Sequence, residues 1–246
     1  MGEKTVSRLK KAFRIYRWVS GIVGVMAVGY LLLIMFPQVL MANSVEYRHF
    51  RVYSREKLDE NTLHPVLDRA EEKLRSSPIY DETVPRRVYL TSSFGMYGLL
   101  SPKAWQSFGN SLPFINNMLV SPSDPASDSV YNNRSYHNRR SLSGVIAHEA
   151  THLFIRQRYG TVAASLMPAW KNEGYCEYIA GESTIPLDEG VRLWLESPND
   201  DTGYRYSKYH AMIKYLIEKK GVSVDELFTT KLDESAVAAE TLASYQ

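Results

Sequence analysis

The chain has 246 residues, with 29 lysines and arginines against 27 aspartates and glutamates, so its formal net charge is +2. Six of the basic residues and one acidic residue lie in the first 17 positions, and from residue 46 onward 23 basic and 26 acidic residues leave a net charge of −3. No basic stripe remains outside the N-terminal tail, which argues against a nucleic-acid partner. The single cysteine, Cys176, excludes an intramolecular disulfide.

An uncharged stretch follows the basic tail. Residues 18–45 contain no charged side chain, and residues 19–36 are almost wholly apolar. About 20 residues suffice to cross the hydrocarbon layer of a bilayer, whereas the apolar part of a cleaved signal peptide usually has about 7–15 residues. Met41-Ala42-Asn43 is also a poor match to a small-x-small cleavage site. This composition favours an uncleaved anchor over a signal peptide.

The expected organisation has three parts. Residues 1–17 form a basic cytoplasmic tail, residues 18–40 a transmembrane anchor, and residues 46–246 one domain. Because positively charged flanks stay in the cytoplasm, we expect a single-pass membrane protein whose domain is periplasmic or at the cell surface. About 200 residues can bury the core of one domain.

The first part of this domain combines short strand patterns with one helix. Alternating apolar residues predict strands, and apolar residues three and four positions apart predict a helix. Residues 94–110, rich in glycine and aromatic side chains, fit neither pattern. The predicted elements are, in chain order, a strand at residues 50–52, a helix at 58–74, and strands at 87–91 and 118–120.

Residues 121–140 read as a polar loop. Proline and serine open this segment, and its basic side chains, Arg134, Arg139 and Arg140 with His137, are interpreted as solvated rather than as a phosphate site. The strand at 118–120 precedes it directly. That strand is either a sheet edge, with which an extended peptide could pair, or a buried strand without a free edge.

Helices dominate the rest of the chain. An apolar run at residues 142–155 predicts a helix that Ser141 or Ser143 caps and Gly160 ends. A second helix is expected from about Pro168 to Gly181, and further helices at residues 189–196 and 207–220. The fold class is therefore α+β: a small mixed sheet packed on the helix of residues 142–155, followed by a helical subdomain, and preceded by one transmembrane helix.

The helix at residues 142–155 carries the pattern H-E-x-x-H. His148 and His152 are four positions apart and lie on one helix face, so that both imidazoles can bind one zinc ion. Glu149 lies beside them, where it can take a proton from zinc-bound water and pass it to a leaving amine. Zinc lowers the pKa of that water to about 7 and polarises the scissile carbonyl.

A catalytic zinc site typically needs a third protein ligand. Residues 170–178 read W-K-N-E-G-Y-C-E-Y, in which Glu173 and Glu177 are four positions apart on one helix face. One of them can bind the metal while the other accepts an imidazole N–H. Cys176, three positions after Glu173, is interpreted as a small buried side chain.

The motif H-E-x-x-H, followed after about twenty residues by N-E-G-x-x-E-Y, resembles the gluzincin metallopeptidases, the group that includes thermolysin. The resemblance covers about residues 141–182 and implies a zincin-like domain. It implies that Glu173 is the third zinc ligand, beside His148 and His152, and that Glu177 braces a metal-binding histidine. Gluzincins also often draw a tyrosine or histidine from the helical half to stabilise the oxyanion. We expect Tyr204 or Tyr206 in this role, ahead of Tyr209 and His210.

The sequence thus predicts a membrane-anchored zinc peptidase that acts on proteins or peptides. Two alternatives stay open. The first is a catalytically silent, metal-stabilised binding module on the same scaffold, which would not need the base Glu149. The second is a zinc hydrolase that acts on another bond.

Overall fold

A computed structural model describes residues 3–198 and 203–246. The chain forms two compact units, Met1–Val39 and Leu40–Gln246. One long helix makes up most of the first unit. The second contains all strands of the described residues and the candidate site, and each unit is described by itself below.

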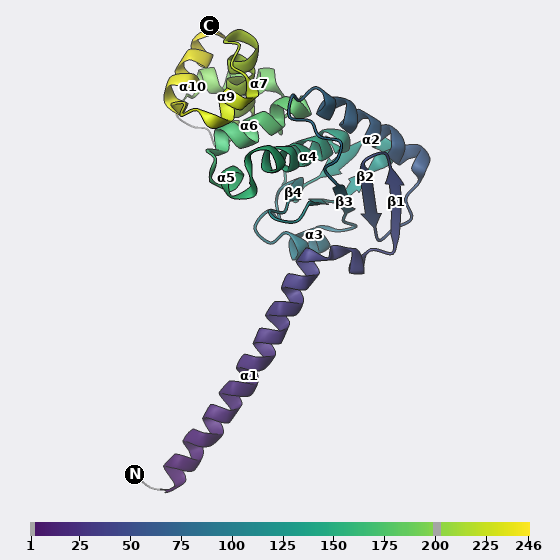
Figure 1. The fold of residues 1–246 in the computed structure, drawn as a ribbon, viewed down its shortest axis with the longest axis vertical. Coiled ribbons are helices and arrows are strands. Elements are labelled where there is room, and N and C mark those ends of the chain that lie inside the picture. The colour runs from purple at the N-terminus through teal and green to yellow at the C-terminus, as the bar shows by residue number, and fades with distance from the viewer. Residues whose placement is uncertain (1–2, 199–202) are drawn as a thin grey trace. The chain divides into compact units, whose positions relative to one another are not determined.

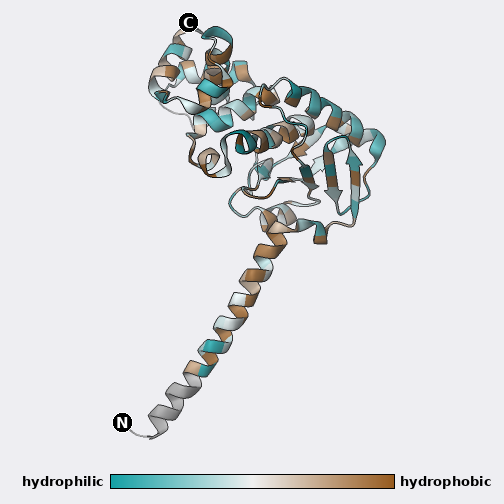
Figure 2. Ribbon diagram, viewed as in Figure 1, coloured by the Kyte–Doolittle hydropathy of each residue, from teal (hydrophilic) through white to brown (hydrophobic). Residues whose placement is uncertain are grey.

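Helix α1, Glu3–Met35, forms the first unit (Figure 1). Its part Phe13–Met35 is long and apolar enough to cross a membrane or to be a signal sequence, and apolar residues dominate it in Figure 2. Helix α1 begins within the basic tail and ends before Pro37, so it starts earlier and ends earlier than the predicted anchor of residues 18–40. A proline disfavours helical backbone in the preceding residue, so the chain continues as a short 3-10 helix, η1, Pro37–Leu40.

The second unit is built on a five-stranded mixed sheet with the order β1-β2-β3-β5-β4. The three inner strands are parallel, and the two outer strands run antiparallel to their neighbours. This is the small mixed sheet of the α+β prediction. The strands are β1 Asn43–Tyr47, β2 Phe50–Ser54, β3 Arg86–Leu90, β4 Gly109–Ser111 and β5 Asn117–Val120.

The strand next to the candidate site is β4. Strand β5, which contains residues 118–120, lies between β3 and β4 with all four residues buried, so it is the buried strand of the two alternatives. The sheet edge comes instead from the segment that fitted no pattern, which folds as α3, Phe94–Leu100, a loop and β4. Three residues are too few to show a strand period in sequence.

The expected loop at residues 121–140 contains a second, three-stranded sheet, and that prediction was wrong. Its strands have two or three residues, without the apolar alternation that marks a strand in sequence. Asp128, in a left-handed conformation with φ 46°, accepts hydrogen bonds from the backbone and hydroxyl of Ser143. The small sheet is thereby tied to the next helix. Its strands are β6 Ser123–Asp124, β7 Ser129–Tyr131 and β8 Arg139–Ser141, with η2, Pro125–Ser127, between the first two.

Helix α4, Leu142–Tyr159, contacts α2, Glu60–Arg75, the strands β4 and β5, and the next long helix. Its N-cap is Ser141, which accepts a hydrogen bond from the backbone of Gly144, and Gly160 ends it with φ 88°. Every residue of its first half is buried, which accounts for the apolar run in the sequence.

The remaining helices form the C-terminal part of the unit (Figure 1). The helix predicted at residues 207–220 begins earlier and changes to π-helical geometry at Tyr215. The elements are α5 Thr161–Leu166, α6 Ala169–Ala180, α7 Leu187–Glu196, α8 Arg205–Lys214, the π-helical turn η3 Tyr215–Lys219, α9 Val224–Thr229 and α10 Glu234–Ala243.

Helices α6 and α8 approach closely at Gly174. A Cβ atom there would lie 2.7 Å from the carbonyl oxygen of Tyr209 and 2.8 Å from Cγ1 of Ile213. The backbone of α8 cannot yield as a flexible side chain would. Gly174 therefore sets the distance between the helix that carries Glu173 and the helix that follows Tyr204.

We predict that Gly174→Ala lowers the free energy of unfolding by about 1–3 kcal/mol, because the added methyl group overpacks this contact. Urea unfolding followed by circular dichroism measures the change. Gly95→Ala in α3 is the matched control, since no atom lies within 4 Å of its Cβ position and alanine favours a helix. Equal stability of the Gly174 variant and the wild type would contradict the prediction.

Candidate metal centre

His148 lies between two carboxylates of α6. Its Nε2 is 3.3 Å from Oε2 of Glu173, and its Nδ1 is 3.3 Å from Oε1 of Glu177. The Nδ1 contact is an ion-pair distance without hydrogen-bond alignment. Because Glu173 and Glu177 are one helical turn apart, their carboxylates reach the two nitrogens of one imidazole.

His152 directs its Nε2 toward the same carboxylate. This atom lies 3.7 Å from Oε1 of Glu173, while Nδ1 lies 2.9 Å from Oδ1 of Asn172. The amide nitrogen of Asn172 donates to the carbonyl of Ala164, so its oxygen is the end that faces His152. Nδ1 of His152 therefore carries the proton, and the lone pair of Nε2 points toward Glu173.

Two distances in this group are close to those between zinc ligands. Ligand atoms about 2.0–2.2 Å from a tetrahedral zinc ion lie about 3.4 Å from one another, and Nε2 of His148 and Nε2 of His152 lie 3.3 and 3.7 Å from Oε2 and Oε1 of Glu173, respectively. Two imidazoles and one carboxylate also match the ligand types of a catalytic zinc site with one open position.

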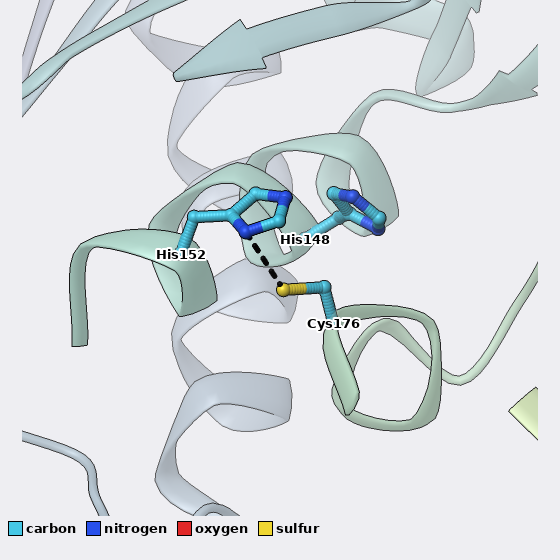
Figure 3. A group of neighbouring side chains, drawn as sticks. All are labelled: His148, His152 and Cys176. Atoms are coloured by element: carbon cyan, nitrogen blue, oxygen red, sulfur yellow. Dashed lines mark hydrogen bonds between the residues drawn. The ribbon is translucent and has the colours of Figure 1, made fainter. Parts of the chain in front are cut away.

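A second donor set shares the two histidines. His148, His152 and Cys176 offer ligand atoms within 4.8 Å of one another and could hold a metal ion (Figure 3). Sγ of Cys176 lies 3.3 Å from Nδ1 of His152, the nitrogen that also contacts Asn172. Burial, followed by the nearby carboxylates, raises the pKa of the thiol well above its usual value. As interpreted from sequence, Cys176 is buried.

A buried arginine holds Glu177. Arg140 donates from both terminal nitrogens to the Glu177 carboxylate, at 3.0 and 2.9 Å, and also contacts Glu182. The exposed fractions of the Arg140 and Glu177 side chains are 6% and 1%, so Arg140 does not belong to a solvated basic loop as its sequence context suggested. The bidentate contact fixes both oxygens of Glu177 and turns one toward His148.

The charges of this buried group compensate one another. Burial would raise the pKa of the Glu177 carboxyl, but Arg140 and then His148 outweigh it and lower that pKa. Burial would likewise lower the pKa of His148, but Glu177, Glu173 and Glu149 outweigh it and raise that pKa. Without a metal, the imidazole of His148 is therefore protonated on both nitrogens at neutral pH. A metal ion that binds Nε2 would displace the proton from that atom.

Glu149 lines a cleft of about 700 Å³ together with His148, His152 and Glu173. Its side chain packs on the sheet edge at Gly109, where a Cβ atom would lie 2.7 Å from Oε1 and 2.8 Å from Cγ of Glu149. The main chain of β4 thus sets the position of this carboxylate. Glu149 is buried but borders open space beside the proposed ligands.

Of the two tyrosines expected to face the site, only Tyr206 lines the cleft. Partial burial, followed by the three glutamates of the site, raises the pKa of its hydroxyl, which stays protonated at neutral pH. Tyr204 is buried and donates its hydroxyl to the carbonyl of Ser197. His210 is buried near Ser183 and does not line the cleft.

No protein-family model matches the chain, and no curated protein is significantly similar to it. The resemblance to gluzincins therefore rests on the motif residues. The structure brings together His148, Glu149, His152, Glu173 and Glu177. The sequence did not predict three further residues of the site, which are Asn172, Arg140 and Gly109. Asn172 adjoins Glu173 in the motif, whereas the other two have no local signal.

We predict that Glu177→Gln weakens zinc binding by about 10- to 100-fold. The neutral amide attracts the Nδ1 proton of His148 less than the carboxylate does, which leaves Nε2 a weaker zinc ligand. Competition with a fluorescent zinc chelator measures the affinity of the full chain in detergent micelles. Glu182→Gln is the matched control, since Glu182 also contacts Arg140 but makes no ion pair with either histidine in the described part of the chain. Equal affinity of the two variants would contradict a role for Glu177 at His148.

Proposed function

We propose that the chain is a membrane-anchored zinc peptidase that hydrolyses peptide bonds by attack of water, with Glu149 as general base. The observation that carries the proposal is the approach of both Nε2 atoms to the carboxylate of Glu173, at 3.3 and 3.7 Å, beside a cleft that Glu149 also lines. We assign the zinc ligands to His148, His152 and Glu173.

Two observations favour Glu173 over Cys176 as the third ligand. Glu173 lines the cleft, whereas Cys176 has no exposed surface. A metal that binds substrate must keep a position open to the cleft. The nitrogen of His152 that faces Cys176 also carries a proton directed at Asn172.

Each residue around the metal would have its own part in peptide hydrolysis. Zinc, when bound, supplies a Lewis acid that lowers the pKa of water to about 7 and polarises a carbonyl. Glu149 takes the proton from the attacking water and delivers it to the leaving amine, so that no acyl-enzyme forms. Arg140 and Glu177 orient His148. The protonated hydroxyl of Tyr206 donates to the oxyanion that develops on the substrate carbonyl.

The N-terminal helix indicates where in the cell the proposed enzyme would act. Helix α1 would hold the enzyme in the membrane, and its basic flank would stay in the cytoplasm. The domain of Leu40–Gln246 would then act outside the cytoplasm on proteins or peptides near the membrane. No nucleic-acid partner is proposed.

The first test is Glu149→Gln in the zinc-loaded full chain. We predict a loss of peptide hydrolysis of about 10²- to 10⁴-fold, because the amide cannot accept the proton, with one zinc ion still bound per chain. Hydrolysis is measured with quenched fluorescent peptides and unfolded casein, and zinc by elemental analysis. Undiminished turnover by the variant would exclude this role of Glu149. A wild type that binds zinc but cleaves no peptide would favour the silent module or a hydrolase of another bond.

The second test is Tyr206→Phe. We predict that kcat falls by about 10- to 1000-fold with little change in KM, because the lost hydrogen bond forms mainly in the transition state. Tyr204→Phe is the control, since its hydroxyl donates to a main-chain carbonyl away from the cleft. If only the Tyr204 variant were impaired, the assignment of the oxyanion donor would be overturned.

A further inference from the structure

Arg156 is a cation of the cleft that the proposed chemistry does not use. It lies four positions after His152 on α4, about 6 Å further along the helix axis, and lines the same cleft as Glu149. Its Nη1 donates to Oγ of Ser111 on the edge strand β4 at 3.3 Å. The guanidinium thus lies beside the sheet edge, in the same cleft as the proposed ligands.

The guanidinium of Arg156 has no carboxylate partner within 4.0 Å among the described residues. Its Nη2 is buried and makes no hydrogen bond there either. Two arginines with buried side chains differ from the half-buried Arg156, because Arg86 is paired with Glu71 at 2.6 Å and Arg140 with Glu177 at 2.9 Å.

An unpaired charge in this position is costly. Taking a guanidinium out of water is unfavourable unless a counter-charge compensates, and arginine cannot release its proton under ordinary conditions. Burial lowers the pKa of Arg156, and Glu149 offsets only part of that effect. The cleft therefore contains a guanidinium whose positive charge an anionic ligand would compensate.

The shape of the group and its place in the cleft select the anion. A guanidinium matches the planar geometry of a carboxylate through two parallel hydrogen bonds. The Arg156 residue is half-buried and lies in the wall of the cleft. A free chain end supplies a carboxylate on every peptide, whatever its sequence.

We propose that Arg156 binds the free C-terminal carboxylate of a peptide, so that the enzyme removes short C-terminal fragments. This inference rests on the proposed peptidase function and narrows it to a class of substrate. The carboxylate would occupy the leaving-group side of the scissile bond, where it fixes the register of the peptide against the metal.

The test compares two peptides that differ only in a free acid or an amide at the C-terminus. For the zinc-loaded full chain in detergent micelles, we expect kcat/KM for the acid to exceed that for the amide by about 10- to 100-fold. Arg156→Gln should remove this preference, because it should slow hydrolysis of the free-acid peptide and leave that of the amide peptide unchanged. The control is Arg158→Gln on the same helix, whose side chain is 57% exposed and paired with Asp225.

A binding measurement separates this inference from the proposed function. In a Glu149→Gln background, fluorescence anisotropy gives the Kd of each labelled peptide without turnover, and Arg156→Gln should weaken the acid about 10- to 100-fold. Arg156→Lys, which keeps the charge but loses the planar pair of donors, should retain part of the preference. It also serves as the second variant if Arg156→Gln does not fold.

Three outcomes would overturn the inference. If Arg156→Gln lowered kcat/KM equally for the acid and the amide peptide, Arg156 would have a structural role only. A preference that follows a glutamate rather than a glutamine within an amidated peptide would assign the carboxylate to a side chain. Equal Kd values for acid and amide in the Glu149→Gln background would exclude the subsite. Failure to cleave any peptide, with the Kd preference intact, would instead reject the peptidase and leave the anion site standing.

Discussion

The candidate centre depends on the compensation of charge between α4 and α6. Two histidines of one helix face two glutamates of the other, and Glu177 is almost entirely removed from water. A carboxylate at that depth destabilises the fold unless a cation and hydrogen bonds accompany it. Arg140 provides both, and it comes from β8 rather than from either helix. The small second sheet can therefore be understood as the support that delivers this side chain to the interior.

The same arrangement gives each side of His148 a different environment. On one side Glu177 and Arg140 form a closed, buried group, and on the other Glu173 faces the cleft. His152 repeats the pattern with a neutral partner, because Asn172 holds one nitrogen and leaves the other toward Glu173. Both rings thus have one nitrogen committed to the protein interior and one directed at the proposed metal. Side chains held on both sides in this way lose little freedom when they bind an ion.

Sequence reasoning worked where structure is local. The limits of α4 and α6 follow from Ser141, Gly160 and Gly181, and the i, i+4 spacing places the metal-binding candidates on facing surfaces. The strands β3 and β5 are apolar enough to be recognised. Elements of two or three residues, such as β4 and β7, have no period to read, and so the strand at the edge of the sheet was not recognised. Arg140 and Arg156 make their contacts with other elements, for which the order of residues provides no pattern.

Gly109 shows that such a contact can extend the candidate site beyond the motif residues. It belongs to an edge strand, yet any side chain at this position would meet Glu149 and Val145 of α4. A substitution there would act as a change to the proposed general base, although it lies well before the motif in the chain. For protein engineering, this strand position is consequently not a neutral site for redesigning the cleft wall. A survey of natural variants that scored only the H-E-x-x-H segment would class such a change as harmless.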